Sequence, residues 1–241
     1  MSMILNIETA TDICSVSLSN NGILKDIREI SEGRSHAGTL TVFINEILES
    51  NKLSACDLNA VAVSMGPGSY TGLRIGVSVA KGICYGADLP LIAIPTLEAM
   101  FVGMQDKLRL EGMDIKSDDI FAPMIDARRM EVYLALFNAE GNVVKETSAV
   151  IIEPETFQSY LRKNKMYFFG SGSEKLSNII ISENAIFNGG FKISSSYMIP
   201  IAQMKFEKQQ FENIAYFEPF YLKDFLATIP KDKMKFKTEA D

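Results

Sequence analysis

A glycine-rich stretch of twelve residues, Met65 to Gly76, holds residue types that can bind anions. It reads MGPGSYTGLRIG and follows the apolar run Ala60 to Val63. A strand, a glycine turn and a helix start present free backbone N–H groups and the positive end of a helix dipole to a phosphate. The spacing fits neither a P-loop, because no Lys follows Gly72, nor the dinucleotide fingerprint, which has one residue fewer. Phosphate binding by this loop alone is therefore the weaker interpretation.

Acidic residues at two predicted turns could help to hold a nucleotide. Glu8 ends the first predicted strand and Thr9 follows it, and Asp126 directly follows the equivalent strand in the second half. Carboxylates and hydroxyls in such turns bind phosphate through Mg²⁺ or water, although they are also common turn formers. We expect the two acids to face each other across a cleft between the halves. The residues considered for phosphate or nucleotide binding are Glu8, Thr9, Gly66, Gly68, Ser69 and Asp126.

The residue types give little support for a metal site or for a catalytic nucleophile. The chain has one histidine, His36, and three widely spaced cysteines, Cys14, Cys56 and Cys84. The cysteines match neither a disulfide framework nor a zinc site, and we expect them to be reduced and buried. His36 stands at a predicted helix start, where it would assist capping rather than catalysis. A Gly-x-Ser-x-Gly motif is absent, so no catalytic residue and no metal site are predicted.

The helix predicted from about Ser69 to Tyr85 carries small residues on two neighbouring stripes. Each glycine inside a helix costs about 1 kcal/mol relative to alanine, so a close contact must offset that cost. Small residues four apart allow another backbone to approach closely. Two interpretations stay open: the helix packs tightly on its own sheet, or one stripe faces the sheet while the other meets a partner subunit. The first row is Gly72, Gly76, Ala80 and Cys84, and the second is Ser78, Gly82 and Gly86.

The second interpretation makes a specific prediction about the first row. If Gly76 and Ala80 face outward, bulky replacements there should block a partner while leaving the fold largely intact. Arg74 lies in the first turn, where the helix dipole disfavours a cation. An ordinary ion pair, for example with Glu8, is the simpler interpretation of Arg74, and contact with an anion or a partner is the alternative.

Composition and charge limit the class of protein. The chain of 241 residues has 47% hydrophobic residues and a formal net charge of -6. It contains no apolar stretch of about eighteen residues and no export signal at its start, so we expect a cytoplasmic protein without membrane association. No long run of Lys or Arg precedes the tail, and clustered cations are needed to neutralise phosphates. Any contact with nucleic acid is therefore expected only through a partner.

A strand pattern that occurs twice organises the chain. Each half opens with three predicted strands, at 4–8, 13–19 and 23–30 and again at 121–125, 130–137 and 143–151. Gly22 and Gly141 supply the hairpin turns. Helices at 36–50, with Ser35 as N-cap, and at 69–85 alternate with strands at 60–64 and 91–94, and a further helix begins at Thr96. The order predicts an α/β fold of two βββαβα-type halves with mixed sheets flanked by helices.

The predicted division of the chain follows this repeat. We assign residues 1–104 to the N-terminal half and 105–205 to the C-terminal half, with a polar linker at 105–119. Short helices at 155–162 and 173–181 flank a strand at 166–169, and 183–196 is irregular. A last helix within about 206–226, beginning at Phe206 and extending to about Ala215, should pack back on the first half. The charged segment 227–241 is predicted to be a flexible tail.

Five segments, in order and across most of the chain, resemble the TsaB (YeaZ) family. They are ILNIETA at 4–10, the stretch at 65–76, AKG at 80–82, DARRMEVY at 126–133 and PFYLK at 219–223. The resemblance implies a duplicated actin-like ATPase (RNase H-like) fold. It also implies a non-catalytic subunit of tRNA N6-threonylcarbamoyladenosine (t6A) modification at position 37. Such a subunit binds and activates the transferase TsaD, is joined by the ATPase TsaE and reaches tRNA only through the complex. Without its partner, the partner-binding surface should drive weak homodimerisation, because an exposed apolar patch seeks cover.

The resemblance also implies where the partner binds. It places the surface on the helices at 36–50 and 69–85, and it assigns no cofactor to this chain itself. A nucleotide, ATP or ADP with Mg²⁺, at the partner interface stays open. Tyr70 stands where the family usually has Phe, which leaves the details of the contact open. The implied partner-binding residues are His36, Leu40, Phe43, Ile47, Tyr70, Gly72, Leu73, Arg74, Gly76, Val77, Ala80, Lys81 and Cys84.

Two other functions are considered beside this one. One is a glycoprotease-like (peptidase M22-type) hydrolase, and the other is a stand-alone nucleotide-binding ATPase. TsaD-like proteins carry a His-x-x-x-His metal site where this chain has Thr96 and Met100, with Glu98 between them. Because both histidines are replaced, a metal-dependent hydrolase is disfavoured. The missing Lys of the glycine loop similarly disfavours the ATPase.

Overall fold

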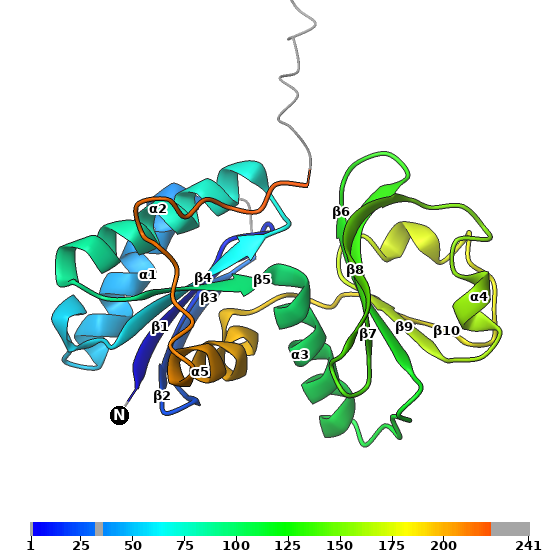
Figure 1. Ribbon diagram of the computed structural model, residues 1–241, viewed down its shortest axis with the longest axis horizontal. Helices are drawn as coiled ribbons and strands as arrows, with labels where there is room; N and C mark the ends of the chain where they lie inside the picture. Colours follow the sequence, from blue (N-terminus) through cyan, green and yellow to red (C-terminus); the bar gives the residue numbers. More distant parts are fainter. Residues whose placement is uncertain (1, 32–35, 223–241) are drawn as a thin grey trace, which may run out of the picture.

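The computed structural model describes residues 2–31 and 36–222. Two five-stranded sheets lie side by side, and helix α3 (Thr96–Leu110) lies between them (Figure 1). Apolar side chains of α3, among them Leu97, Met100 and Phe101, pack against Phe121 and other residues of the second sheet. Ala99 of the same helix packs against the first sheet. The two halves therefore share a core along α3.

The first sheet has the strand order β3-β2-β1-β4-β5. β1 pairs antiparallel with β2 and parallel with β4, and β5 extends the parallel part. The central strands read as near-continuous apolar runs because helices cover both faces of this sheet. The Asn21-Gly22 turn joins β2 to β3, with Gly22 at a φ of 75°, as predicted. The strands are β1 (Met3–Glu8), β2 (Cys14–Asn20), β3 (Ile23–Ile30), β4 (Ala60–Gly66) and β5 (Leu91–Pro95).

The second sheet repeats the first. Its order β10-β9-β6-β7-β8, read from β8, gives the same succession of a meander followed by two parallel strands. This repetition confirms the predicted duplicated actin-like (RNase H-like) fold. The turn glycine Gly141, with a φ of 86°, is again as predicted. The strands are β6 (Ile120–Asp126), β7 (Glu131–Asn138), β8 (Val143–Ile151), β9 (Met166–Phe169) and β10 (Ala185–Asn188).

Two groups of helices cover opposite faces of the first sheet. α1 (His36–Ser50) and α2 (Tyr70–Ala87) share a core with alternate residues of β1 and β4, such as Leu5 and Val61. The other face, with Ile4 and Ala62, packs against η3 (Ser195–Met198), α5 (Ile199–Glu207) and α3. A short helix η1 (Ala55–Asp57) precedes β4, and α4 (Gln158–Leu161) and η2 (Glu174–Leu176) lie in the second half. Ser35, the predicted N-cap of α1, lies outside the described residues.

The C-terminal part departs most from the prediction. The helix predicted from Phe206 onward is wrong: α5 begins earlier, with Pro200 in its first turn, and ends at Glu207. Proline is well tolerated at a helix start, which lets the helix begin there. Residues 208–222, here termed the C-terminal strap, run past β5, where Glu212 pairs with Leu91, to α2 (Figure 1). The tail predicted at 227–241 lies outside the described residues.

Other boundaries also shift. Helix α3 runs to Leu110, so the linker predicted from 105 begins only after that residue. Residues 195–205, assigned to the second half, pack on the first sheet instead. The helices predicted at 155–162 and 173–181 shorten to α4 and η2, while the irregular span 183–196 contains β10. Within the described ranges, no helix combines the length and the apolar character needed to cross a membrane.

Candidate functional site

The glycine-rich loop is filled by a turn of the same chain. A β-carbon on Gly68 would lie within 3.0 Å of the Ala10 carbonyl, and one on Gly72 would clash with the Thr9 carbonyl. On Gly76 it would meet the Thr9 hydroxyl. The glycines are therefore required because the β1–β2 turn packs directly on the backbone of α2. The close contact that offsets their cost to the helix is internal.

This packing uses the groups that an anion would need. The Ser69 N–H donates to the Ala10 carbonyl at 2.7 Å, and the Ser69 hydroxyl accepts from the Gly72 N–H at 3.2 Å. On the other side of the loop, a β-carbon on Gly66 would lie 2.7 Å from the Phe220 carbonyl of the strap. The phosphate site considered at Glu8, Thr9, Gly66, Gly68 and Ser69 is thus occupied by the chain's own backbone.

Glu8 is enclosed in this turn rather than exposed in a cleft. Its side chain has no exposed surface, and its Oε1 accepts from the Ala10 N–H, while Oε2 has no hydrogen-bond partner. Burial raises the pKa of Glu8 to about 7, and the hydrogen bond from the Ala10 N–H opposes this rise. The expectation that Glu8 faces Asp126 across an open cleft is therefore wrong.

Asp126 has partners of its own in the second half. Its carboxylate accepts from Lys175 Nζ at 2.7 Å and from the Arg128 N–H at 2.7 Å. Lys175 Nζ also donates to the Arg129 and Glu131 carbonyls at 2.8 and 2.7 Å. Lys175 thus stabilises a turn in which Arg128 and Arg129 both have a positive φ. Partial burial raises the pKa of Asp126, but the hydrogen bond and charge of Lys175 bring it below its usual value.

His36 anchors the same β1–β2 turn from the side of α1. Its Nε2 lies 2.8 Å from the Thr11 carbonyl. The predicted capping role is therefore replaced by a contact between α1 and the turn. Cys14 and Cys84 are buried as predicted, whereas Cys56 is exposed, because it lies in the short surface helix η1. All three cysteines are free, and no cluster of three metal-binding residues occurs in the described part of the chain.

The first row of small residues on α2 faces inward. Ala80 and Cys84 are completely buried in the core that α1 and α2 share with the first sheet. The expectation that bulk at Gly76 or Ala80 would leave the fold intact is wrong, because both positions lack space. Eight residues assigned to partner contact are buried in this chain: Leu40, Ile47, Gly72, Leu73, Gly76, Val77, Ala80 and Cys84.

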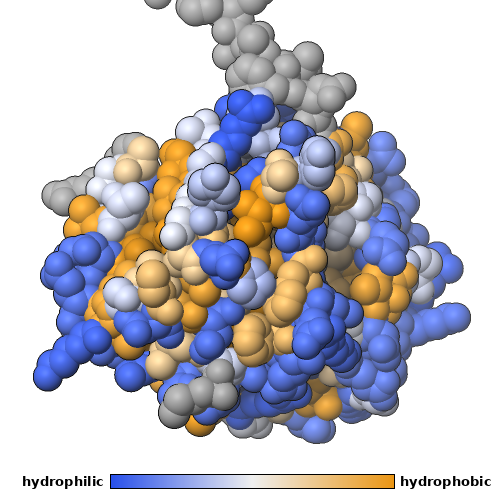
Figure 2. All heavy atoms as spheres, turned by 60° about the vertical axis from the view of Figure 1, so that its left-hand side comes forward, coloured by the Kyte–Doolittle hydropathy of each residue, from blue (hydrophilic) through white to orange (hydrophobic). Residues whose placement is uncertain are grey.

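The second row faces outward. A β-carbon on Gly82 or Gly86 would meet nothing within 4 Å, and Ser78 is exposed beside them. Tyr85 on the same side of α2 is 85% exposed, and Val42 of α1 is 49% exposed. On the side of the molecule that carries the first sheet, apolar side chains are exposed between polar ones (Figure 2). Of the assigned residues, His36, Phe43, Tyr70, Arg74 and Lys81 keep accessible surface.

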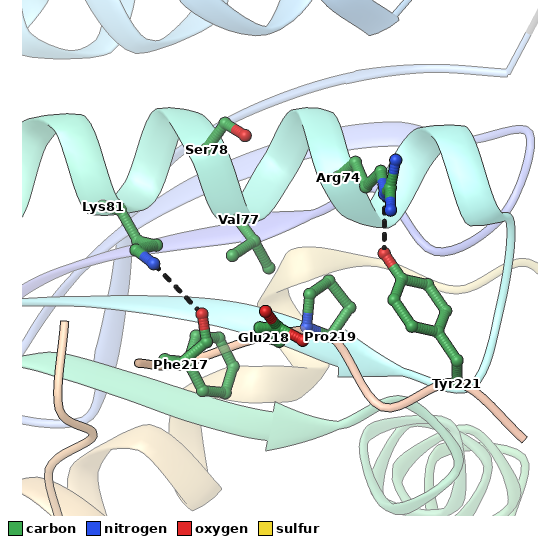
Figure 3. A pocket seen from close by; sticks show the side chains of 8 residues that line it. All are labelled: Arg74, Val77, Ser78, Lys81, Phe217, Glu218, Pro219 and Tyr221. Carbon is green, nitrogen blue, oxygen red and sulfur yellow. Dashed lines mark hydrogen bonds between the residues drawn. The ribbon is translucent and has the colours of Figure 1, made fainter. Parts of the chain in front are cut away.

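A cavity of about 200 Å³ opens between α2 and the strap. Lys81 Nζ donates to the Phe217 carbonyl at 3.1 Å, and Arg74 Nε donates to the Tyr221 hydroxyl at 3.2 Å (Figure 3). Arg74 therefore does not pair with Glu8. The strap residues of this site were not assigned from sequence, although PFYLK was among the family-like segments. The cavity is lined by Arg74, Val77, Ser78, Lys81, Phe217, Glu218, Pro219 and Tyr221.

Known proteins similar to this chain agree with this architecture. The family model described as "TsaD: tRNA N6-adenosine threonylcarbamoyltransferase" matches residues 29–231. The tRNA threonylcarbamoyladenosine biosynthesis protein TsaB of Escherichia coli (strain K12) is 32% identical, over 93% of this chain and 96% of that protein. TsaB of Haemophilus influenzae is 26% identical, over 92% and 93%.

The fold has a close counterpart among solved structures. YeaZ from Pseudomonas aeruginosa superposes with a TM-score of 0.76 at 22% identity, and the match covers 92% of this chain and 100% of that one. At this identity the likeness concerns the fold. Together with the E. coli relative and the match to the family model over most of the sequence, it places the chain within the TsaB (YeaZ) family.

Proposed function

We propose that this chain is a non-catalytic subunit in the formation of t6A on tRNA, and that it binds and activates a TsaD-type transferase. The names of its relatives support the pathway. The observation that carries the binding role is the outward face of α2, where Gly82 and Gly86 leave the helix backbone bare beside Ser78. Helical glycines that no internal contact requires are unfavourable, and a second polypeptide packed on them would offset their cost.

The residues at the former metal positions support a subunit without its own chemistry. Thr96 and Met100, which replace the histidines of TsaD-like proteins, are buried in the described structure, Met100 in the core around α3. The transferase would then supply the reacting groups, and this chain would stabilise its active form. The ATPase TsaE would join this pair, and tRNA would reach this chain only through the complex.

The experiment compares two glycine variants in binding and in modification. The TsaD-type transferase of the same organism is titrated with this chain by calorimetry, and t6A formation is measured with and without the chain. Gly82→Leu should weaken binding at least about tenfold and lower t6A formation, because bulk separates the backbones. Gly189→Leu is the matched control, since Gly189 is exposed on the second half and has open space around it.

The two variants distinguish loss of the partner surface from a general effect of placing leucine at an exposed glycine. Equal binding by wild type and Gly82→Leu would contradict the assigned surface. Modification that is equally efficient without this chain would contradict the role itself. Running the titration with and without ATP and Mg²⁺ tests whether a nucleotide joins at the interface. In the absence of the transferase, the same face should pair two copies weakly, which light scattering over a concentration series would detect.

A further inference from the structure

The guanidinium of Arg74 is held in a fixed position by two tyrosines. Its central carbon lies 4.2 Å from the centre of the Tyr70 ring and 6.0 Å from that of Tyr221. The two rings are 5.0 Å apart and tilted by 43°. Arg74 Nε also donates to the Tyr221 hydroxyl (Figure 3). The side chain is therefore both stacked on the Tyr70 ring and hydrogen-bonded. Stacking on aromatic faces is a favourable environment for an arginine cation.

Tyr221 is in turn positioned by the anchored strap. Lys81 Nζ binds the Ala215 and Phe217 carbonyls at 3.4 and 3.1 Å. The Phe220 N–H donates to the Met65 carbonyl at 2.7 Å, and the Phe217 side chain is buried against the core. A segment about 140 residues further along the chain thus fixes the orientation of one arginine on α2. Such an arrangement reduces the conformational entropy that the arginine would lose on binding.

The charge of Arg74 has no counterpart inside the described chain. No carboxylate of residues 2–31 or 36–222 lies within ion-pair distance of its guanidinium. The two terminal nitrogens of Arg74 have no hydrogen-bond acceptor in the same described part. Glu218 lines the cavity and only adds a longer-range attraction. The two terminal nitrogens, with four N–H donors, are therefore available to an acceptor outside the described part of the chain.

We propose that Arg74, held by Tyr70 and Tyr221, is the receptor for a carboxylate side chain of the partner subunit. This inference rests on the proposed function, because it names the chemistry that the partner brings to α2. A planar guanidinium matches a carboxylate through two parallel hydrogen bonds. Arg74 lies one turn before Ser78 and two turns before Gly82 on the exposed face of α2. A partner helix or loop on that face could therefore place an acid beside it.

The surroundings favour a carboxylate over a phosphate group. The cavity of about 200 Å³ has room for one side chain. Arg74 lies in the second turn of α2, away from the free N–H groups of the helix start. The carboxylate of Glu218 would repel a doubly charged phosphate more strongly than a singly charged carboxylate.

The test measures the affinity for the transferase in the full chain. Arg74→Gln should weaken binding at least about tenfold, and Arg74→Lys should recover only part of the loss, because an ammonium cannot form the paired hydrogen bonds. Tyr221→Phe keeps the ring but removes the hydroxyl, and should weaken binding by roughly threefold through poorer positioning. Arg162→Gln, at an exposed arginine of the second half, is the matched control.

Acids on the transferase surface are then changed singly to their amides and combined with Arg74→Gln. One of them should show a coupling with Arg74 in the double-mutant cycle. If Arg74→Gln binds the transferase as tightly as wild type does, this inference is overturned while the proposed function stands. Wild type that fails to bind the transferase would instead overturn the proposed function. A third result would also overturn the carboxylate proposal. If inorganic phosphate binds the isolated chain through Arg74 and no transferase acid is coupled to Arg74, the ligand of Arg74 is a phosphate group.

Discussion

The Thr9 hydroxyl occupies the place that a β-carbon on Gly76 would take. We therefore expect Gly76→Ala to lower the free energy of unfolding by about 1 to 3 kcal/mol, because overpacking outweighs the better helix propensity of alanine. Gly82→Ala is the matched control, since its β-carbon meets nothing and should gain up to about 1 kcal/mol. Urea unfolding of both variants measures the difference. A Gly76→Ala protein as stable as wild type would contradict the packing of the β1–β2 turn on α2.

The buried carboxyl of Glu8 should make stability depend on pH. Burial raises the pKa of Glu8 to about 7 in the folded chain, from 4.5. Between these values the unfolded chain releases its proton while the folded chain keeps it, so stability falls as the pH rises and the loss is complete above about 7. This shift corresponds to a loss of roughly 3 kcal/mol.

Glu8→Gln removes the ionisation but keeps an oxygen that can accept from the Ala10 N–H. Its free energy of unfolding should equal that of wild type near a pH of about 4 and exceed it at a pH of about 8. Chemical denaturation across this range measures both curves. Parallel curves for the two proteins would show that Glu8 does not titrate in this window. Glu155→Gln, at an exposed carboxyl of the second half, serves as a control for a general effect of charge.

Lys175 should stabilise the turn that presents Arg128 and Arg129. Its ammonium makes three hydrogen bonds, to the Asp126 carboxylate and to two carbonyls of the turn. Lys175→Met keeps much of the aliphatic chain but leaves these acceptors without the cation, and should cost about 1 to 3 kcal/mol of stability. Lys163→Met, at an exposed lysine of the same half, should change it little. Loss of Lys175 should also raise the pKa of Asp126, which NMR titration would follow.

The parts of the fold that sequence predicted best have strong local signals. Gly22 and Gly141 marked the two hairpins, and the apolar runs around Ile7 and Val63 marked central strands. The four-residue strand β10 was missed because its residues are all half-buried and show no alternation. The predicted helix from Phe206 extended too far because apolar residues continue through Phe217, where they serve the strap.

The candidate site was predicted only in part, because tertiary packing decides which face of α2 is exposed. The two small rows of α2 look equivalent in the sequence. Their burial differs because the Thr9 turn docks on Gly72 and Gly76, while Ala80 and Cys84 pack in the core of the first sheet. The contact of Arg74 with Tyr221 joins residues 147 positions apart, which no local pattern reveals. The sequence did contain the relevant residue types: it marked Ser78, Gly82 and Gly86 as a separate row, and Tyr221 within PFYLK.

The anchoring of the strap by Lys81 gives a prediction that joins stability to partner binding. Lys81→Met removes the bonds to the Ala215 and Phe217 carbonyls, so the strap should open more often from α2. The Phe220 amide, bonded to the Met65 carbonyl, should then exchange hydrogen about tenfold faster.

Global stability should change far less than this local exchange, because the strap contributes mainly Phe217 to the core. Lys107→Met, at a half-buried lysine of α3 outside the strap, should leave exchange at Phe220 as in wild type. Because the strap carries Tyr221, Lys81→Met should weaken transferase binding to about the same extent as Tyr221→Phe. Unchanged exchange at Phe220 would show that other contacts hold the strap, and Arg74 would then keep its orientation without Lys81.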